Sequence, residues 1–233
     1  RSVSRGLGDV YKRQVFANAW ENAGGKYYPK LLSAIPFSPV AGERFLIKKG
    51  YSRKFVIEKL LDALEDLKKF YKVSSAHINF INEPQLQLAL KNKFWFERNN
   101  IQFHWSNQNY ENFEHFLSKL SSSKRKTIRR ERKEIHKSSV LIEIVKNDEI
   151  KNYHSKIFYN FYLSTIEKKW GGVYLNQKFW DLLIQYLKKR IVFIFSKQDG
   201  EFIGGAINLI DQSTIYGRNW GSIKDIKLSL IHI

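Results

Sequence analysis

The stretch from Ser121 to Lys137 reads SSSKRKTIRRERKEIHK, with eight lysines and arginines against two glutamates. It contains no helix breaker, and the serines at its start can cap the free N–H groups of a first helical turn. Apolar residues recur at helical spacing just before it and through it, at Leu117, Leu120, Ile128 and Ile135. We therefore predict one basic helix whose thin apolar stripe docks on a core.

The arginines of this predicted helix fall on one face. Arg125, Arg129, Arg132 and His136 recur every three to four residues, which places them on neighbouring turns. Guanidinium groups held side by side bind phosphate or carboxylate oxygens well. Two interpretations stay open, because a run of charge more often marks a solvated helix face than a binding site. The density of arginine, which binds planar anions better than lysine does, favours an anion site.

The totals describe a folded and strongly basic chain. Its 233 residues are 43% apolar and 15% aromatic, enough for one large or two small domains with a core. The net charge of +18 favours polyanionic partners, namely tRNA, nucleotide phosphates or an anionic membrane surface. There is no cysteine, so no disulfide framework and no thiolate metal site is expected. No apolar run approaches the roughly 20 residues that a membrane span needs.

The two ends of the chain read as translated sequencing adapter. Residues 9–14 (DVYKRQ) and 228–233 (LSLIHI) back-translate to the two orientations of one transposase mosaic-end sequence. We therefore expect residues 1–14 and 228–233 to be non-native, and the remainder to be a fragment cut at both ends. The ends carry a net charge of +3, so the remainder still carries +15.

The first part of the remainder predicts alternating helices and strands. Residues 27–40 contain three prolines, which favour an extended segment at a sheet edge or cleft wall. The clearest helix runs over 52–71 with Ser52 as N-cap, and a second runs over 82–92 with Asn82 as N-cap. Short strands are predicted at 44–48, 76–81, 94–97 and 101–105. The predicted buried stripe of the first helix consists of Phe55, Leu60, Leu61, Leu64, Leu67, Phe70 and Tyr71.

The second part ends in a predicted antiparallel meander. An apolar strand over 140–145 is followed by predicted helices over 148–168 and 176–189, the second with Asn176 as N-cap. The last strands are predicted at 191–197, 201–210 and 214–220, with Asp199-Gly200 as a hairpin turn. Gly204-Gly205 predicts a bulge or a close approach of the backbone to a ligand. This order predicts an α+β layered fold whose two halves meet near Trp105.

Two candidate site clusters combine polar and aromatic side chains. His104 lies at the end of the predicted strand over 101–105, where a neutral imidazole can take or give a proton near pH 7. The alternative is a half-buried structural histidine. Trp170 and Tyr174 follow a charged run, and Gly171 breaks the helix there. These residues shape a cleft or form an ordinary helix end, and the sequence leaves both interpretations open.

A third cluster lies on the last predicted strand. Strict alternation predicts that Tyr216, Arg218 and Trp220 share one face of this strand. Asn208 on the adjacent strand is expected to face the same side. The cation between two aromatic rings is either a stack that holds the sheet together or a pocket wall for a nucleotide or a peptide.

Several catalytic motifs are missing from the sequence. It has no GxxxxGK[ST] phosphate loop, no HExxH, no cysteine nucleophile, no GxSxG and no run of residues at metal-ligand spacing. The short loop that cradles the coenzyme A pyrophosphate in many acetyltransferases is not evident either. We therefore expect no metal and no covalently bound cofactor. A reaction that depends mainly on positioning the reactants suits these residues better.

Four motifs, taken in order, resemble one family. They read YYPKLLSAIPFSPVAGERFL (27–46), IQFHWSN (101–107) with the basic stretch after it, FYLSTIEKKWG (161–171), and GGAINLI followed by YGRNWG (204–221). Residues 15–221 resemble the FemAB-like family of peptidoglycan biosynthesis/recognition proteins. Lys168 departs from the family pattern, which often has arginine there. The segment that usually follows YGRNWG is absent, so the resemblance implies an incomplete second cleft and an inactive fragment.

The resemblance implies a fold and an activity. The fold is that of the GNAT-like acyltransferases, with mixed or antiparallel sheets flanked by helices in two tandem modules, here 15–105 and 106–227. The activity is transfer of an acyl or aminoacyl group from aminoacyl-tRNA or acyl-CoA to an amine, for example on a peptidoglycan precursor. The basic helix and the strand that carries Arg218 are expected to converge on one pocket, with Arg125 on its wall.

The resemblance and the clusters together give the expected site residues. His104, Tyr216 and Arg218 are expected to be catalytic. The residues expected to bind substrate or phosphate are Lys124, Arg125, Lys126, Arg129, Arg130, Trp170, Tyr174, Asn208 and Trp220.

Two further functions stay open beside the transferase. One is a non-catalytic basic module that binds a cell-wall precursor or RNA. The other is a coenzyme A-dependent acetyltransferase that acts on a small amine. The expected partners are tRNA or a nucleotide-linked precursor, and the expected location is the cytoplasm, with peripheral contact with the anionic inner membrane.

Overall fold

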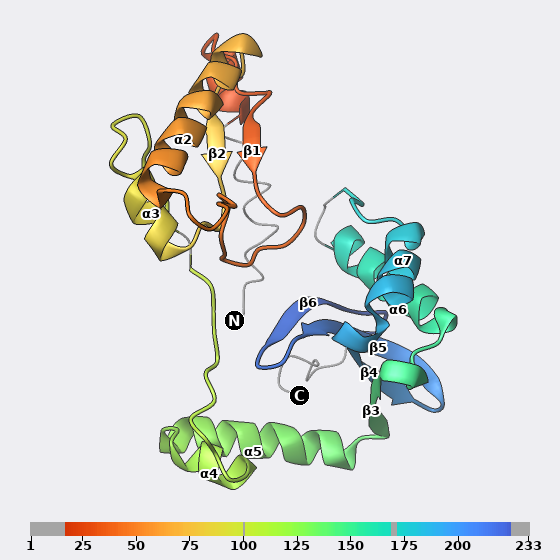
Figure 1. The fold of residues 1–233 in the computed structure, drawn as a ribbon. Coiled ribbons are helices and arrows are strands. Elements are labelled where there is room, and N and C mark those ends of the chain that lie inside the picture. The colour runs from red at the N-terminus through yellow and green to blue at the C-terminus, as the bar shows by residue number, and fades with distance from the viewer. Residues whose placement is uncertain (1–16, 100, 169–171, 225–233) are drawn as a thin grey trace. The chain divides into compact units, whose positions relative to one another are not determined.

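A computed structural model describes residues 17–99, 101–168 and 172–224 of the chain (Figure 1). It divides into two compact units between Trp105 and Ser106, and each is described here by itself. The expected boundary also followed Trp105, but the assignment of the two units to acyltransferase modules stays a prediction. The stretches expected to be adapter, 1–14 and 228–233, lie outside the described residues.

The first unit contains a short parallel sheet and two capped helices. Its elements are β1 (Leu31–Ser33), α2 (Arg53–Phe70), β2 (Ala76–Ile78) and α3 (Glu83–Ala89), after a short helical stretch over 17–22. β1 pairs in parallel with β2, so the proline-containing segment is extended at a sheet edge as predicted. The predicted N-caps are confirmed, because the side chain of Ser52 accepts a hydrogen bond from the N–H of Phe55 and that of Asn82 from Gln85.

The core of this unit lies between α2, α3 and the segment before α2. Phe45, Ile57, Leu61 and Ala89 are buried there, and partly buried apolar side chains, including Trp95, pack around them. The fully buried side chain of Gln85 accepts from the N–H groups of Arg44 (2.8 Å) and Phe45 (3.1 Å) and donates to the carbonyl of Phe45 (2.7 Å). A buried amide thus satisfies backbone groups that no strand pairs.

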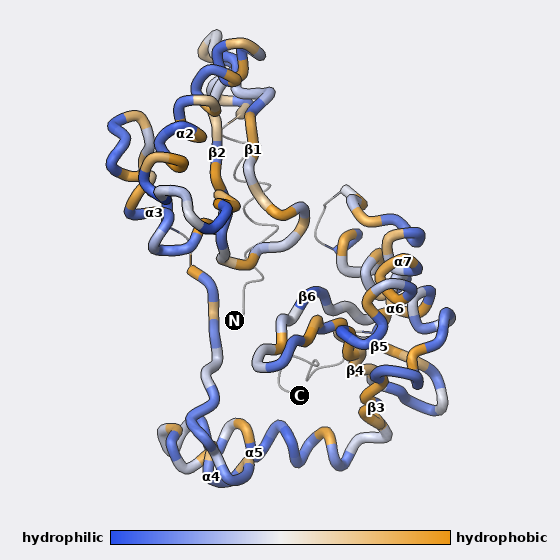
Figure 2. The backbone as a smooth tube through the Cα atoms, in the orientation of Figure 1, coloured by the Kyte–Doolittle hydropathy of each residue, from blue (hydrophilic) through white to orange (hydrophobic). Residues whose placement is uncertain are grey.

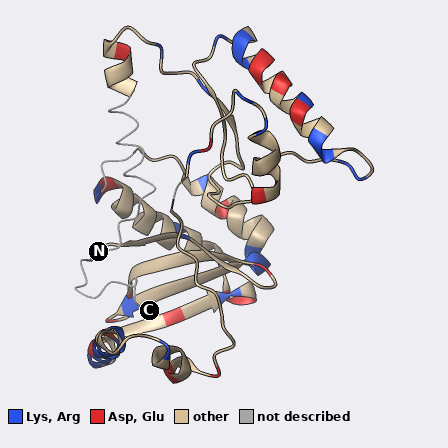
Figure 3. Cartoon of the chain, turned by 90° about the vertical axis from the view of Figure 1, so that its left-hand side faces the viewer, with Lys and Arg blue, Asp and Glu red and all other residues tan. Residues whose placement is uncertain are grey.

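The predicted buried stripe of α2 is largely wrong. Only Leu61 of that set is fully buried, beside Ile57, which was not in it. Five of the seven predicted residues are exposed: Phe55, Leu60, Leu67, Phe70 and Tyr71. Apolar residues occur on more than one side of α2. Only the row formed by Ile57 and Leu61, four residues apart, faces the core. Its outer surface carries lysines and acidic residues in pairs three or four positions apart, such as Lys59–Asp62 at 3.6 Å (Figure 3).

Three strands predicted in the first unit are absent from its described residues. Residues 44–48, 94–97 and 101–105 have no strand pairing, and β2 ends at Ile78, although Ile81 forms an isolated bridge with Gly42. The local alternation is present in the sequence, but no neighbouring strand is available to pair with it. Instead, Trp95 turns into the core while Phe94 and Phe96 stay exposed.

The second unit begins with the two helices α4 (Phe113–Ser118) and α5 (Ser122–Lys137). α5 confirms the predicted basic helix. Ser121 takes the N-cap position, but its hydroxyl makes no capping bond, and no residue of α5 is buried. Figure 2 shows α5 as mostly hydrophilic. Of the predicted apolar stripe, only Leu117 on α4 is fully buried, so the stripe docks far less deeply than expected.

The rest of the second unit is an antiparallel sheet with helices. β3 (Val140–Lys146) is followed by α6 (Asn152–Lys168) and α7 (Gln177–Leu187), then by β4 (Ile191–Gln198), β5 (Glu201–Ile210) and β6 (Ile215–Ser222). The sheet order is β3-β4-β5-β6, with every neighbour antiparallel. The helix predicted over 148–168 starts later, at Asn152, after a 3-10 turn at Asn147–Glu149.

Large aromatic side chains build the core where α6 and α7 lie against one face of the sheet (Figure 1). Phe158 and Tyr162 of α6 contact Trp180 of α7, with ring centroids 5.1 and 5.5 Å apart. Phe193 and Phe195 of β4 stack at 5.2 Å beneath them. Because these rings are almost fully buried, the hydrophobic effect fixes the layered arrangement.

The predicted meander is confirmed. Asp199 and Gly200 both have positive φ, 51° and 82°, which matches the hairpin turn predicted between β4 and β5. A register shift places one extra residue of β5, Ile203, beside Gly204, so the predicted bulge is present as well. The close approach at Gly205 is to protein: a Cβ there would lie 2.7 Å from the ring of Phe195.

The α+β layered class is confirmed and is compatible with a GNAT-like fold. None of the described helices is long and apolar enough to cross a membrane.

Candidate functional site

The arginine face of α5 is occupied by contacts with α4. Nη1 of Arg125 donates to the carbonyl oxygens of Leu120 (2.8 Å) and Ser118 (3.2 Å), which are free acceptors at the end of α4. Arg129 forms an ion pair with Glu114 at 2.5 Å. The guanidinium of Arg132 lies 4.3 Å from the ring centroid of Phe113. Three arginines of the face therefore hold the two helices together.

A neighbouring line of cations on α5 has no such partners. Lys126, Arg130, Lys133 and Lys137 follow one another at spacings of four, three and four residues, so they form one stripe along the helix. All four are exposed, and none forms an ion pair with a described residue. Since a helix rises about 1.5 Å per residue, the stripe is about 16 Å long. Two of its members, Lys126 and Arg130, were predicted to bind phosphate, whereas Lys133 and Lys137 were not.

The predicted common face of Tyr216, Arg218 and Trp220 is wrong. Tyr216 pairs with Leu209 and Trp220 with Ala206, residues that point to opposite faces of β5. The register shift between Ile207 and Asn208 inserts Arg218 as an extra residue in β6, and this bulge reverses the alternation. Gly217, which pairs with Asn208 next to this bulge, was the available sequence signal, because a glycine inside a strand often marks a bulge.

Asn208 and Trp220 share the face opposite Tyr216. The side-chain amide of Asn208 donates to the carbonyl of Val192 at 3.4 Å, which ties it to the neighbouring strand. The hydroxyl of Tyr216 donates to Asp211 at 3.2 Å. The pKa of Asp211 is lowered because its carboxylate also accepts from the N–H groups of Ser213 and Thr214. Tyr216 therefore closes the turn between β5 and β6.

α6 meets β6 at Gly221. A Cβ at this position would lie 2.1 Å from the carbonyl oxygen of Phe161, so only glycine fits without a shift of the backbone. Thr165 donates to the carbonyl of Trp220 (3.1 Å), and Ser164 donates to that of Ser222 (2.9 Å). These bonds fix the backbone on both sides of the close approach.

Asn219, next to this contact, is a polar residue that the sequence analysis did not single out as a site residue. It pairs with Ile207, which faces the core, and its Oδ1 is buried without a hydrogen-bond partner among the described residues. Buried polar atoms of this kind are uncommon in folded proteins. The motif YGRNWG contained this asparagine, but nothing in its sequence pattern separated it from its neighbours.

Tyr174 lies over Tyr162, and Trp170 falls outside the described residues. The hydroxyl of Tyr162 accepts from the N–H groups of Tyr174 (3.3 Å) and Leu175 (3.2 Å). Burial raises the pKa of Tyr162 above its ordinary value. The rings of Tyr162 and Tyr174 meet edge to face at 5.8 Å, so the segment after α6 is packed back onto that helix.

His104 is exposed and belongs to the first unit. Its Nε2 lies 3.0 Å from Oε1 of Gln102 and donates to it. The alternative of a half-buried structural histidine is therefore wrong. The catalytic role of His104 stays a prediction, as do those of Tyr216 and Arg218. Arg125 donates to carbonyl oxygens at the end of α4, and its common pocket with Arg218 stays a prediction.

His154 is a buried histidine that sequence reasoning missed. Its Nδ1 accepts from the N–H of Lys151 at 2.9 Å, which leaves the proton of the neutral ring on Nε2, a buried atom that has no partner in the part of the chain that the structure describes. The imidazole stacks on Phe195 with centroids 5.6 Å apart. Burial lowers the pKa of His154, opposed in part by the negative charge of Glu143. The residue is a neutral part of the core.

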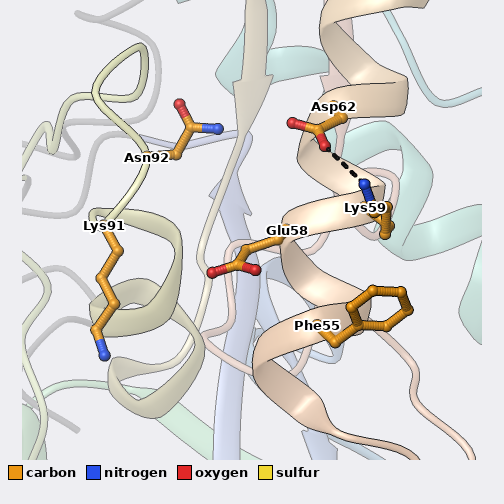
Figure 4. Close-up of a pocket in the computed structure, with 6 residues that line it drawn as sticks. All are labelled: Phe55, Glu58, Lys59, Asp62, Lys91 and Asn92. Carbon is orange, nitrogen blue, oxygen red and sulfur yellow. Dashed lines mark ion pairs between the residues drawn. The ribbon is translucent and has the colours of Figure 1, made fainter.

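An open surface pocket of about 400 Å³ lies beside α2 (Figure 4). It is lined by Phe55, Glu58, Lys59, Asp62, Lys91 and Asn92, none of which was a predicted site residue. Its two acids have lysine partners on α2, because Lys54 lies 3.9 Å from Glu58 and Lys59 lies 3.6 Å from Asp62. No group of three potential metal ligands occurs within the described ranges.

Comparison with known proteins supports the resemblance drawn from the motifs. The family model FemAB_like, described as peptidoglycan biosynthesis/recognition, matches residues 4–232, nearly the whole chain. No curated protein sequence matches the chain. The chain therefore belongs to the FemAB-like family of peptidoglycan biosynthesis/recognition.

Proposed function

We propose that this protein is an acyl or aminoacyl transferase that modifies an amine on a peptidoglycan precursor. The observation that carries the proposal is the family match over residues 4–232. The donor is aminoacyl-tRNA or acyl-CoA, both of which carry phosphates. The strongly basic chain, with its net charge of +18, supports a donor of this kind.

The reaction is a simple acyl exchange. The acceptor nitrogen attacks the carbonyl carbon of the donor ester or thioester, and a C–N bond forms. The C–O bond to the tRNA or the C–S bond to coenzyme A breaks, and the proton lost by the amine ends on the leaving group. Such a reaction needs two reactants held in register and a route for one proton. His104, Tyr216 and Arg218 are the groups we propose for the proton and for the developing charge.

The phosphates of the donor are proposed to contact α5. Of the five residues predicted to do so, Arg125 and Arg129 already have partners on α4, whereas Lys126 and Arg130 are free of described partners. Lys124 is exposed as well. We therefore place the phosphate contact on the unpaired cations. Trp170, Tyr174, Asn208 and Trp220 are proposed to line the acceptor or donor cleft.

A transfer assay tests the proposal. The full-length protein is incubated with labelled aminoacyl-tRNA or acyl-CoA and with a soluble amine acceptor, and the amide product is measured by mass spectrometry. We expect product with one donor, and its loss in the Arg218→Ala variant. Lys48→Ala/Lys49→Ala, which changes two exposed lysines outside the proposed site, is expected to keep full activity. Equal activity of Arg218→Ala and the parent chain would contradict the site assignment.

A second function is favoured by the unpaired stripe of α5. A basic module that only binds a cell-wall precursor or RNA would show salt-sensitive binding in the same mixture and no product. Protection against heat by acetyl-CoA, with acetylation of a small amine, would instead indicate a small-molecule acetyltransferase. We place the protein in the cytoplasm, in peripheral contact with an anionic membrane.

A further inference from the structure

Several hydrogen bonds stabilise the turn that follows α3. The N–H groups of Lys91 and Asn92 bond to the carbonyls of Leu88 (3.3 Å) and Ala89 (3.1 Å). Oδ1 of Asn92 accepts from the N–H of Phe94 (3.0 Å), and the backbone carbonyl of Asn92 accepts from the N–H of Trp95 (3.2 Å). Hydrogen bonds thus hold the backbone from Lys91 to Trp95.

This turn holds two phenylalanine rings in solvent. Trp95 packs against the core of Phe45, Ile57, Leu61 and Ala89, which anchors the segment. Its neighbours Phe94 and Phe96 are 76% and 88% exposed. Single exposed apolar residues are common on protein surfaces. Two large rings on either side of an anchored tryptophan form a paired apolar projection that water solvates poorly.

Exposed lysine and arginine side chains flank the two rings in the sequence. Lys91, Lys93 and Arg98 are exposed, and none forms an ion pair with a residue that the structure describes. Glu97 is the single acid between Lys91 and Asn99. Phe55 on α2, 58% exposed, lines the same pocket as Lys91 and Asn92, together with Glu58, Lys59 and Asp62 (Figure 4).

We propose that residues 91–98, which we call the Phe94–Phe96 turn, dock the protein on an anionic phospholipid surface. Aromatic rings are favoured at the boundary between headgroups and acyl chains, and lysine and arginine beside them contact lipid phosphates. Neither the insertion of apolar rings nor basic charge anchors a protein alone, whereas the two together do. The proposal gives the peripheral membrane contact a location and does not depend on the transferase chemistry.

A fluorescent probe on the turn tests the proposal directly. The chain has no cysteine, so Phe96→Cys carries the only site for an environment-sensitive thiol-reactive fluorophore. We expect a blue shift and an intensity gain on vesicles of phosphatidylcholine with phosphatidylglycerol, and little change on pure phosphatidylcholine. The matched control is Phe70→Cys, which replaces a ring that is 77% exposed at the end of α2. An unchanged spectrum at position 96, or an equal shift at both positions, overturns the proposal.

Vesicle co-sedimentation supplies the second measurement. Phe94→Ser/Phe96→Ser is expected to lower the partition coefficient at least about tenfold, and Lys91→Gln/Lys93→Gln/Arg98→Gln by at least about tenfold. Phe70→Ser/Tyr71→Ser and Lys48→Gln/Lys49→Gln/Lys72→Gln are the matched controls, expected to bind like the parent chain. Circular dichroism checks that each variant is folded.

Three outcomes count against the turn as the membrane contact. Parent-like partition of the Phe94→Ser/Phe96→Ser variant places the contact elsewhere. Equal binding to neutral vesicles removes the role of the cations. A probe at position 96 that responds to single-stranded RNA and not to vesicles shows base stacking instead. Transfer to a soluble acceptor is measured separately, so its failure bears on the proposed function and leaves the membrane proposal standing.

Discussion

At the scale of single residues, His154 makes stability depend on pH. Its pKa in the folded chain is lowered by burial, whereas in the unfolded chain it lies near 6.5. Below about pH 6.5 the unfolded chain therefore binds a proton that the folded chain does not bind, and the free energy of unfolding falls as the pH is lowered. We expect the urea midpoint to drop between pH 8 and pH 5 for this reason.

The variant His154→Asn isolates this contribution. Its side-chain oxygen can still accept from the N–H of Lys151, but it does not titrate. We expect the variant to be less stable at pH 8, because a packed ring is lost, and its stability to fall less steeply toward pH 5 than that of the parent. A pH dependence identical to that of the parent would show that other groups cause it.

Gly221 offers a second test at a single residue. In Gly221→Ala the new methyl group meets the carbonyl oxygen of Phe161 at 2.1 Å, a backbone atom that cannot move alone. We expect a loss of about 1–3 kcal/mol of unfolding free energy, typical of an overpacked contact. Gly172→Ala is the control, because a Cβ there has no neighbour within 4 Å. Equal stability of the two variants by chemical denaturation would show that α6 and β6 separate easily.

Residue-level prediction succeeded where the chemistry is local. Ser52, Asn82 and Asn176 were recognisable as N-caps because a short polar side chain before a helix has few other uses, and all three accept the expected hydrogen bond. His154 gave no such signal, because its environment is made by Phe193 and Phe195, about forty residues away in sequence.

At the scale of elements, α5 separates two kinds of positive charge. Its arginine face holds α4, whereas the stripe of Lys126, Arg130, Lys133 and Lys137 is unpaired among the described residues. Replacing all four stripe residues by glutamine is therefore expected to weaken RNA binding without unfolding the helix pair. Because each neutralised phosphate contributes about 0.7–0.9 to the slope of log K against log salt, the slope is expected to fall by about 3.

The control for this measurement removes the same charge elsewhere. Lys48, Lys49, Lys72 and Lys178 are exposed and lie outside α5. Their replacement by glutamine is expected to change the slope by less than about 1. If the slope of log K against log salt falls equally in both variants, RNA binding depends on net charge and the stripe has no special role. Fluorescence anisotropy with a labelled RNA duplex over a salt series gives both slopes.

Element prediction depended on whether a partner was available. Residues 201–210 form β5 as predicted, since the hairpin turn at Asp199-Gly200 fixes its neighbour within the same local stretch. Residues 101–105 alternate just as clearly but have no strand to pair with in the first unit, so they form none. The exact place of the bulge at Arg218 depends on the register between β5 and β6, for which Gly217 gave only a general signal, and the bulge moved Tyr216 and Trp220 to opposite faces.

At the scale of the whole molecule, the sequence predicted the α+β class and the family but not an assembled site. Layer class follows from the order of helices and strands, which local patterns reveal. The site depends on side chains brought together from distant elements. His104 lies in one unit and Arg218 in the other, and Arg125 is bonded to α4. Their proposed roles therefore rest on the family match, and the transfer assay tests them.

The two units have separate cores, and this predicts how the molecule unfolds. Ile57 and Leu61 belong to the core of the first unit, while Phe158 and Phe193 belong to that of the second. Leu61→Ala is expected to cost about 2–5 kcal/mol and Phe193→Ala about 3–5 kcal/mol, each within its own unit. Calorimetry should then resolve two transitions, with each variant lowering the midpoint of one of them. A single transition that both variants shift equally would show that the two cores unfold as one cooperative body.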